Sequence, residues 1–317
     1  MTTTKPLRVG VIGPAGFGGS YLSVELLNRG HTVIGISRTP EKLGKHPRYI
    51  PRPVNIDDVS STELARSFEG IDVLVSEYGP HTAGVGALLY MPFLETVRKI
   101  ILAVKQSPVK YFLFVGGAGS LHVPGTLECC VDHPDFFVAY RSAIANSEAH
   151  IAYMEERLAA FGAALRRYRN ARIATKEGRA TEEDQKVVAD YEASIKEKDG
   201  ASDFIKAGRT AFMFFDGNTS FKWSFVSPSA LYRPGKRTGK YEVSVDDMVL
   251  EGEQQSADNI FEGRLTGISV ADMAIAIADE VENEKLVGKH WSASGDISDD
   301  KPGAAYLTLE AAEGGSK

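Results

Sequence analysis

A glycine-rich turn near the N-terminus has residue types and spacing that indicate chemistry. Gly13, Gly16 and Gly19 follow the spacing G-x-x-G-x-x-G directly after the apolar run LRVGVI. The first glycine permits a tight turn, the second lets a phosphate approach the backbone, and the third lets a helix pack closely on the strand. The free N–H groups at the start of that helix bind anions. The segment therefore predicts a dinucleotide site formed by Gly13, Ala15, Gly16, Phe17 and Gly19.

The end of the second expected strand bears on the identity of the dinucleotide. An NAD-selective site usually carries Asp or Glu there, whereas this chain has Ser37 and Arg38. A guanidinium can pair with a 2′-phosphate and stack on adenine, and Lys42 follows as a further donor. We therefore expect NADP(H), with Ser37, Arg38 and Lys42 among its ligands. The alternative is that Arg38 and Lys42 are solvated surface charges.

Further candidate ligands follow the later strands, at the edge of the sheet where open α/β folds bind their ligands. Asp57 lies after the expected third strand, Tyr78 after the fourth and Gly117 after the fifth. Ser227 ends the run WSFVS, which we interpret as a sixth strand. We assign all four residues to the cofactor site, with Asp57 at the adenine edge.

Candidates for proton transfer lie in the same loops and in a following helix. His81 and His122 are predicted at this edge, and histidine titrates near neutral pH. Ser120 could donate a hydrogen bond to a substrate carbonyl, and Tyr140 or Tyr78 could act as an acid. A structural or surface role is the alternative for each histidine, a turn-capping role for Ser120 and a packing role for Tyr140.

Aromatic residues are concentrated around the Gly-Asn turn at 217–218. They could line a pocket for a flat ligand, although core packing is the default explanation for most of them. We take Phe215 and Tyr232 as the substrate-binding candidates. The cluster comprises Phe212, Phe214, Phe215, Phe221, Trp223 and Tyr232.

The N-terminal half of the chain predicts the sheet that positions these residues. Apolar runs rich in β-branched residues occur at 7–12, 31–37, 72–76 and 109–115. Helical patterns lie between them, at 19–29, 62–68 and 91–105. Strands separated by helices in this way form a parallel sheet with right-handed crossovers and helices on both faces. We therefore predict an α/β fold, a doubly wound parallel sheet of Rossmann type.

The second half of the chain is expected to complete this sheet and to add helices. A helix is predicted at 143–161, helical arms at 165–176 and 181–197, and a further helix at 268–282. Strands are predicted at 223–227, 241–245 and 290–293, the last as an edge strand.

The changes in composition divide the chain into four parts. Residues 1–162 form the dinucleotide-binding core, and 163–209 are a charged, solvent-facing helical insertion. Residues 210–294 form a substrate-side region that completes the sheet. Residues 295–317 have few apolar side chains and are expected to form a flexible tail.

Composition and charge exclude several classes of protein. The chain of 317 residues is 43% hydrophobic with a net charge of −6, values typical of a folded globular protein that does not bind nucleic acid. We see neither a secretory signal nor a membrane-spanning run, and expect a cytoplasmic protein with no membrane partner. The adjacent Cys129 and Cys130 are expected to be reduced, and no metal site is predicted. A small aromatic substrate and a homodimer are the expected partners.

Several segments together resemble a known family. GPAGFGG (13–19), VGGAGSL (115–121) and FVSPSALYRPGKRTGKYEV (225–243) resemble the atypical short-chain dehydrogenase/reductases of the NAD(P)H-binding, NADH-flavin-reductase-like group. YRSAIANSEAH (140–150) and FFDGN (214–218), with the helical insertion, look most like fungal proteins similar to averufin oxidase A. The resemblance implies an NADPH-dependent reductase that acts on an anthraquinone- or xanthone-like carbonyl or quinone in fungal secondary metabolism.

One departure from the wider superfamily concerns the proton. Ordinary members use a Tyr-x-x-x-Lys pair assisted by serine, whereas Tyr140 is followed four residues later by Ile144. Arg141 points about 100° away from Tyr140 on a helix and cannot replace the lysine. Two alternatives to a reductase therefore stay open. One is an isomerase or cyclase that binds the cofactor without net redox change, and the other is an NADP(H)-sensing regulator of the NmrA-like kind.

Overall fold

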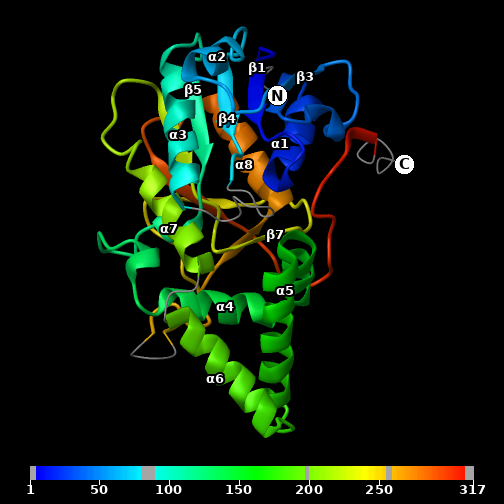
Figure 1. Cartoon of the computed structure of the whole chain (residues 1–317), viewed down its shortest axis with the longest axis vertical. Helices are drawn as coiled ribbons and strands as arrows, with labels where there is room; N and C mark the ends of the chain where they lie inside the picture. Colours follow the sequence, from blue (N-terminus) through cyan, green and yellow to red (C-terminus); the bar gives the residue numbers. More distant parts are fainter. Residues whose placement is uncertain (1–4, 80–89, 197–199, 255–258, 311–317) are drawn as a thin grey trace.

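A mostly parallel sheet forms the centre of the molecule (Figure 1). The computed structural model describes residues 5–79, 90–196, 200–254 and 259–310. Within them the strand order is β3-β2-β1-β4-β5-β6-β10-β8, in which only the pairing of β8 with β10 is antiparallel. The strands are β1 Arg8–Ile12, β2 Thr32–Ser37, β3 Tyr49–Pro53, β4 Val73–Ser76, β5 Tyr111–Val115, β6 Trp223–Val226, β8 Glu242–Val245 and β10 His290–Ser294.

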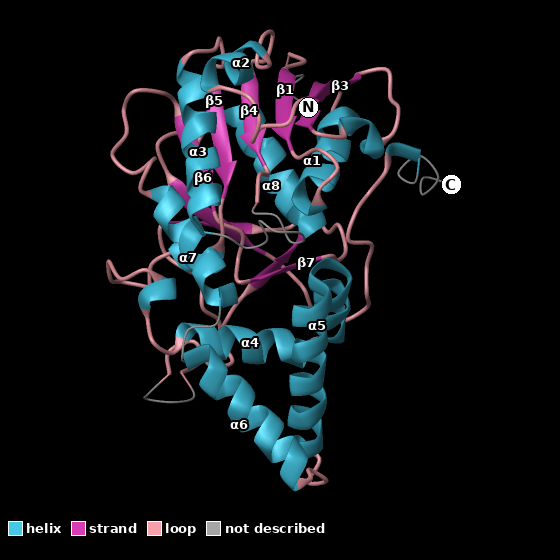
Figure 2. Ribbon diagram, viewed as in Figure 1, coloured by secondary structure: helices cyan, strands magenta, loops and turns pink. Residues whose placement is uncertain are grey.

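Helices cover both faces of this sheet, which confirms the predicted doubly wound α/β fold (Figure 2). Along β5, Tyr111 and Leu113 pack on one side and Phe112 and Phe114 on the other, as the two-residue period of a strand requires. The first core includes α1 Phe17–Asn28 and α8 Val270–Asn283. The second includes α2 Ser61–Arg66, α3 Tyr90–Lys105 and α7 Gly200–Phe212.

Three further helices lie beyond the carboxyl ends of the strands (Figure 1). They are α4 Phe136–Asn146, α5 Glu148–Lys176 and α6 Glu182–Lys196. A small parallel sheet of β7 Leu231–Arg233 and β9 Gly267–Ser269 lies between them and the main sheet. Short 3₁₀ helices are found at Pro40–Leu43, Ala118–Ser120 and Cys130–Asp132.

The single helix predicted at 143–161 is wrong, because two breaks interrupt it. Ser147 ends α4 and caps α5, accepting a hydrogen bond from the His150 N–H (3.1 Å). A second break follows at Leu158 and Ala159, where the backbone is not helical. Gly162 then packs so closely on the backbone of Glu155 that a Cβ would collide with it. The first segment of α5 therefore ends at Arg157.

Two of the predicted helix starts are confirmed by their caps. The Thr181 hydroxyl accepts a hydrogen bond from the Asp184 N–H (3.1 Å) at the start of α6. The Ser269 hydroxyl accepts one from the Asp272 N–H (3.0 Å) at the start of α8. Both helix starts could be predicted from the sequence because a cap depends on residues only three positions apart.

The structure corrects three expectations about the second half of the chain. β10 is an interior strand between β6 and β8, not an edge strand. The boundary at 163 falls inside α5, and α7, which the sequence did not predict, packs on the core beside α3. The charged residues that precede and include α7 made its sequence resemble part of the solvent-facing insertion. Its partner, the core beside α3, is evident only from the tertiary structure.

The flexible tail expected from residue 295 does not describe residues 295–310. The Leu307 N–H donates to the Ser20 hydroxyl (3.1 Å), and the Tyr21 hydroxyl donates to the Ala304 carbonyl (2.6 Å). Ala305 and Leu309 are buried. This segment is therefore packed on α1, while 311–317 lie outside the described residues.

In the described ranges, no helix is long and apolar enough to cross a membrane. The same ranges contain no group of three His, Cys, Asp or Glu residues arranged to hold a metal ion. Cys129 and Cys130 are both free thiols.

Candidate functional site

A cavity of about 620 Å³ opens at the carboxyl ends of β1, β2, β4 and β5. Its size is within the range of pockets that bind small molecules and cofactors. One part, which we call the loop half, is lined by loops that follow the strands and includes Gly13, Ser37, Arg38, Asp57 and Tyr78. The other part, the aromatic half, is lined by Phe17, Tyr140, Tyr153, Arg157, Tyr232 and Tyr306.

The glycine-rich turn shapes the floor of the loop half. Gly13 adopts φ +80°, and its N–H donates to the Ile36 carbonyl (2.9 Å), which ties the turn to β2. A Cβ on Gly19 would collide with the Gly13 carbonyl oxygen, so only glycine allows α1 to start this close to the turn. Gly16 caps α1 without a side-chain hydrogen bond, and the first turn holds no acidic residue. The helix start therefore fits a phosphate group.

Polar residues surround the far end of the loop half. Arg38 is exposed at the end of β2 and lines the cavity beside Ser37. The Asp57 carboxylate accepts hydrogen bonds from the Tyr78 hydroxyl (3.5 Å) and the Thr96 hydroxyl (3.3 Å). Lys42 is exposed on the short helix Pro40–Leu43 and is not among the lining residues. The geometry thus suits a polar nucleoside near Arg38 and Asp57, without Lys42.

Aromatic rings pack together in the other half. The Phe17 ring lies 4.5 Å from the Tyr153 ring and 5.0 Å from the Tyr232 ring, centroid to centroid. Arg157 donates a hydrogen bond to the Tyr153 hydroxyl (2.6 Å). Burial raises the pKa of Tyr153 to about 12 and the pKa of Tyr232 well above its ordinary value. Both hydroxyls therefore keep their protons at neutral pH and can donate hydrogen bonds.

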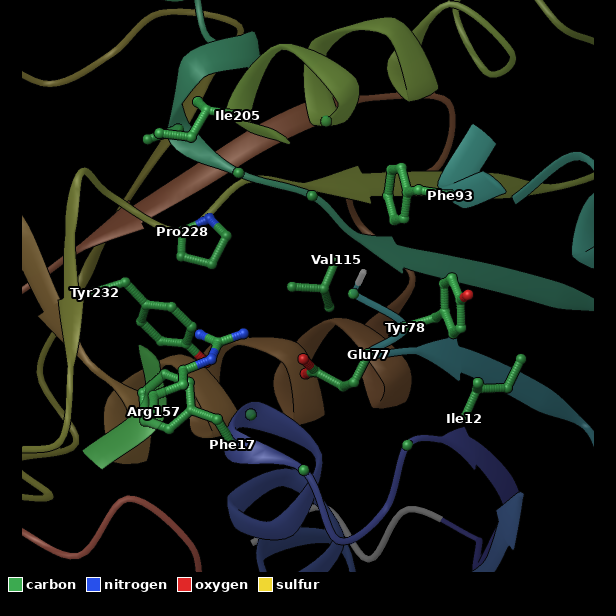
Figure 3. Close-up of a pocket in the computed structure, with 18 of the residues that line it drawn as sticks. Ile12, Phe17, Glu77, Tyr78, Phe93, Val115, Arg157, Ile205, Pro228 and Tyr232 are labelled. Carbon is green, nitrogen blue, oxygen red and sulfur yellow. The ribbon is translucent and has the colours of Figure 1, made fainter. Parts of the chain in front are cut away.

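Glu77 lies where the two halves meet (Figure 3). It directly follows β4, and its carboxylate points toward Tyr232 and Arg157, whereas Tyr78 and Ile12 lie on the other side of the view. Its Oε1 atom is buried and has no hydrogen-bond partner among the described residues. Burial raises the pKa of Glu77 to about 7, although the Arg157 cation opposes this shift. The sequence reasoning missed it, although a charged residue directly after a buried strand was a usable signal.

Tyr140 lines the cavity but lacks the usual lysine. Its ring stacks on Phe136 (5.8 Å between centroids), and burial raises its pKa. Ile144 is completely buried in the core. The Arg141 guanidinium lies over the Tyr140 ring, 5.4 Å from its centroid, and over the Phe161 ring at 4.5 Å. Arg141 is thus nearer to Tyr140 than helix geometry alone suggested, but it contacts the ring face.

Ser120 and Ser227 do not line the cavity. Their hydroxyls are 2.8 Å apart, and both contact His290 Nε2, at 3.2 and 3.0 Å. Both serines are completely buried, and burial lowers the pKa of His290 to about 3. This network links β6 and β10 to the loop after β5. The two serines are therefore not part of the candidate site.

Other sequence candidates also lie apart from the cavity. Phe215 is completely buried and packs on Phe112 and Phe114, which leaves it a core residue. His122 forms backbone bridges with Cys129 and Asp247 and does not line the cavity. Ala15 and Gly19 belong to the glycine-rich turn but do not line the cavity. His81 lies outside the described residues. The candidates that do line it are Gly13, Gly16, Phe17, Ser37, Arg38, Asp57, Tyr78, Gly117, Tyr140 and Tyr232.

Several lining residues besides Glu77 were missed. His150 and Arg157 come from the charged helix α5, where no periodic pattern distinguished them, and Tyr306 comes from the segment expected to be a tail. Burial lowers the pKa of His150 to about 3, so it is neutral near pH 7. Asn55 follows β3 and lines the loop half beside Asp57.

Comparison with known proteins agrees with this geometry. Residues 13–157 match the NAD(P)H-binding family model. The uncharacterized protein YwnB of Bacillus subtilis is 24% identical over 280 residues, which cover 87% of this chain and 93% of YwnB. The segment 13–157 that matches the family model includes the glycine-rich turn, Glu77, Tyr140 and Arg157.

Solved structures show the same fold. A protein of Bacteroides thetaiotaomicron, provisionally described as an epimerase, has a TM-score of 0.60 at 24% identity, covering 92% of this chain and 97% of its own. A provisionally described NADH-flavin reductase of Streptococcus pneumoniae has a TM-score of 0.56 at 19% identity, covering 92% and 100%. The chain therefore has a Rossmann-like fold, and its residues 13–157 match an NAD(P)H-binding domain.

Proposed function

We propose that this protein is an NADPH-dependent reductase of a flat aromatic carbonyl compound or quinone. The observation that carries the proposal is the continuity of one cavity, in which a phosphate-binding helix start and an aromatic chamber meet at Glu77. A dinucleotide held along the loop half would bring its nicotinamide end toward the aromatic half. The reduced nicotinamide supplies a hydride when it is bound.

The loop half offers ligands for the pyrophosphate and for the adenosine end of the cofactor. The start of α1 binds the pyrophosphate through free backbone N–H groups. Arg38 pairs with the 2′-phosphate, which is the reason to propose NADPH and not NADH. Asp57 and Tyr78 border the adenine end.

The aromatic half favours a flat substrate. Phe17, Tyr153 and Tyr232 present ring surfaces, and the protonated tyrosine hydroxyls orient a substrate oxygen. The resemblance to fungal proteins similar to averufin oxidase A makes hydroxyanthraquinones and xanthones of secondary metabolism the first compounds to test.

The direct experiment mixes the purified protein with NADPH and a panel of hydroxyanthraquinones, aromatic ketones and flavins. The absorbance of reduced nicotinamide is followed, and the products are identified by mass spectrometry. We expect stoichiometric NADPH oxidation with at least one aromatic acceptor and slower oxidation of NADH. A protein that binds NADPH but oxidises it with none of these acceptors is not the reductase that we propose.

The alternative is an isomerase or epimerase that uses the site without net redox change. It is favoured by Ile144, which replaces the usual lysine, and by a buried carboxyl group that could move a proton by itself. One of the structurally similar proteins is provisionally described as an epimerase. This alternative predicts a rearranged product while the amount of NADPH stays constant, which chromatography of the same mixtures would detect.

A further inference from the structure

We propose that Glu77 is the residue that exchanges a proton with the substrate, in place of the Tyr-x-x-x-Lys pair. The inference rests on the proposed reductase function and assigns its acid. The Glu77 carboxyl group lines the cavity, directly follows β4 and points into the space between the two halves (Figure 3). No residue of the described chain forms a hydrogen bond with its buried Oε1 atom. A buried polar atom without a partner is costly, and a catalytic role is one explanation for such an atom in a native structure.

The surroundings of the carboxyl group fix where it can act. A Cβ on Gly18 would overlap the Glu77 carboxylate and would lie 3.0 Å from the Tyr232 hydroxyl, so both groups lie next to Gly18 in the first turn of α1. The Phe17 ring, which belongs to the same turn, contacts Tyr232 and Tyr153. Glu77 is therefore placed between the expected pyrophosphate position and the aromatic half.

The charges around Glu77 decide whether it holds a proton. Arg157 of α5 and the positive start of α1 favour the carboxylate, whereas burial favours the neutral acid. The titratable neighbours Tyr153 of α5 and Tyr232 of β7 keep their protons and contribute no negative charge. The result is a pKa of about 7 for Glu77. A pyrophosphate on α1 would add negative charge nearby and raise this pKa further, so the acid is protonated in the complex.

The chemical step is balanced with this one acid. A bound NADPH would supply the hydride to the carbonyl carbon and be oxidised to NADP⁺, the C=O π electrons would move to the oxygen, and this oxygen would take the proton from the Glu77 carboxyl group. Glu77 is left as a carboxylate beside Arg157 and regains its proton from solvent. Each turnover therefore consumes one hydride equivalent and one proton and converts the carbonyl compound into an alcohol.

The first test measures proton uptake and does not need a substrate. NADP⁺ binding is titrated calorimetrically in two buffers of different ionisation enthalpy over the range from pH 6 to pH 9. We expect wild-type protein to take up a fraction of a proton near and above neutral pH, and Glu77→Gln to lose this uptake while it still binds NADP⁺. Equal uptake by both proteins would overturn the inference even if the reductase function holds.

The second test follows kcat against pH with an aromatic acceptor identified in the NADPH assay. The wild-type kcat should fall as pH rises through an apparent pKa at or above about 7, because only the protonated acid donates. Glu77→Gln should lower kcat by about 10²- to 10⁴-fold and remove this pH dependence, with the Kd for NADPH nearly unchanged. Glu77→Asp, which keeps the acid but shortens it, should restore the pH dependence with a reduced kcat.

Tyr140→Phe is the matched comparison, because it removes the hydroxyl that other members of the superfamily use. We expect this variant to keep the pH dependence of kcat. If Tyr140→Phe abolishes the pH dependence and Glu77→Gln retains it, Tyr140 is the acid and the inference is wrong. If the wild type oxidises no NADPH with any acceptor, the reductase proposal fails, and the calorimetric proton uptake still decides whether Glu77 titrates with the cofactor.

Discussion

The two halves of the cavity are built in different ways. In the loop half, the ligand-binding groups follow strand ends within one continuous parallel sheet, and the backbone itself shapes the floor at Gly13 and Gly19. In the aromatic half, the walls come from the start of α1, from α4, α5 and β7, and from the segment at 295–310, which are distant in sequence. The first half thus has the features of a candidate anion and nucleoside site, whereas the second is built from side chains brought together by the tertiary structure of this chain.

The largest effect on stability and binding is expected in the loop half, where the backbones of Gly13 and Gly19 are in close contact. Gly19→Ala would place a Cβ on the Gly13 carbonyl oxygen, and neither atom can move without reshaping the turn. We expect a loss of about 3 kcal/mol in the free energy of unfolding and loss of dinucleotide binding, measured by denaturant titration and calorimetry. Gly117→Ala is the control for stability alone, because no atom lies within 4 Å of its added Cβ, although Gly117 itself lines the cavity. Equal stability of both variants would refute the role of Gly19.

The next effect concerns the boundary between the halves. An acid whose folded pKa is raised from 4.5 to about 7 takes up a proton on folding between these values, so it costs stability above pH 7 and nothing below pH 4.5. Glu77→Gln should therefore stabilise the protein by up to about 3 kcal/mol at pH 8 and by almost nothing at pH 4. Glu95→Gln, at an exposed position on α3, should show no such difference. A gain that does not depend on pH would contradict the burial of a titrating Glu77.

The third prediction tests whether the segment at 295–310 belongs to the aromatic half. Leu309 is only 4% exposed in the α1 and α8 core, and Tyr306 of the same segment lines the cavity. Leu309→Ala should cost about 2 kcal/mol in the free energy of unfolding and raise the KM for the aromatic substrate more than the KM for NADPH. Leu127→Ala is the control, since Leu127 is 89% exposed. If Leu309→Ala were as stable as the wild type, the segment at 295–310 would be a flexible tail, as the sequence analysis expected.

The smallest effect is expected at the exposed end of the loop half. Arg38→Ala should weaken NADPH binding by about tenfold and leave NADH binding nearly unchanged, because only NADPH carries the 2′-phosphate that pairs with the guanidinium. Fluorescence titration with both dinucleotides measures this ratio. Lys42→Ala, which changes a cation outside the cavity, should alter neither affinity. A similar loss for NADPH and NADH would remove the argument for NADP(H).

Short-range patterns predicted the loop half. The strand, the glycine-rich turn and the following helix depend on residues within about twenty positions of one another, so Gly13, Gly16, Ser37 and Arg38 could be placed before the structure was known. The same reasoning failed for Ser120 and Ser227. Their position at strand ends was predicted, but their partner His290 belongs to a strand that was taken for an edge.

The aromatic half could not be predicted, because its contacts are non-local. Arg157 lines the cavity from the end of the first segment of α5, just before the break at Leu158 and Ala159, and Tyr306 lines it from the segment that packs on α1. Neither position carries a periodic signal. Phe215, chosen from an aromatic cluster, turned out to be a core residue because composition gives the presence of rings but not the face that each one presents.

The sequence by itself determined the Rossmann-like sheet and the glycine-rich turn, because both follow from local backbone geometry and the period of apolar residues. Only the tertiary structure decided which side chains share the cavity and which acid among them has a pKa near neutral pH. The physical reason is desolvation: the pKa of Glu77 depends on the atoms that cover it, and those atoms come from α1, α5 and β7.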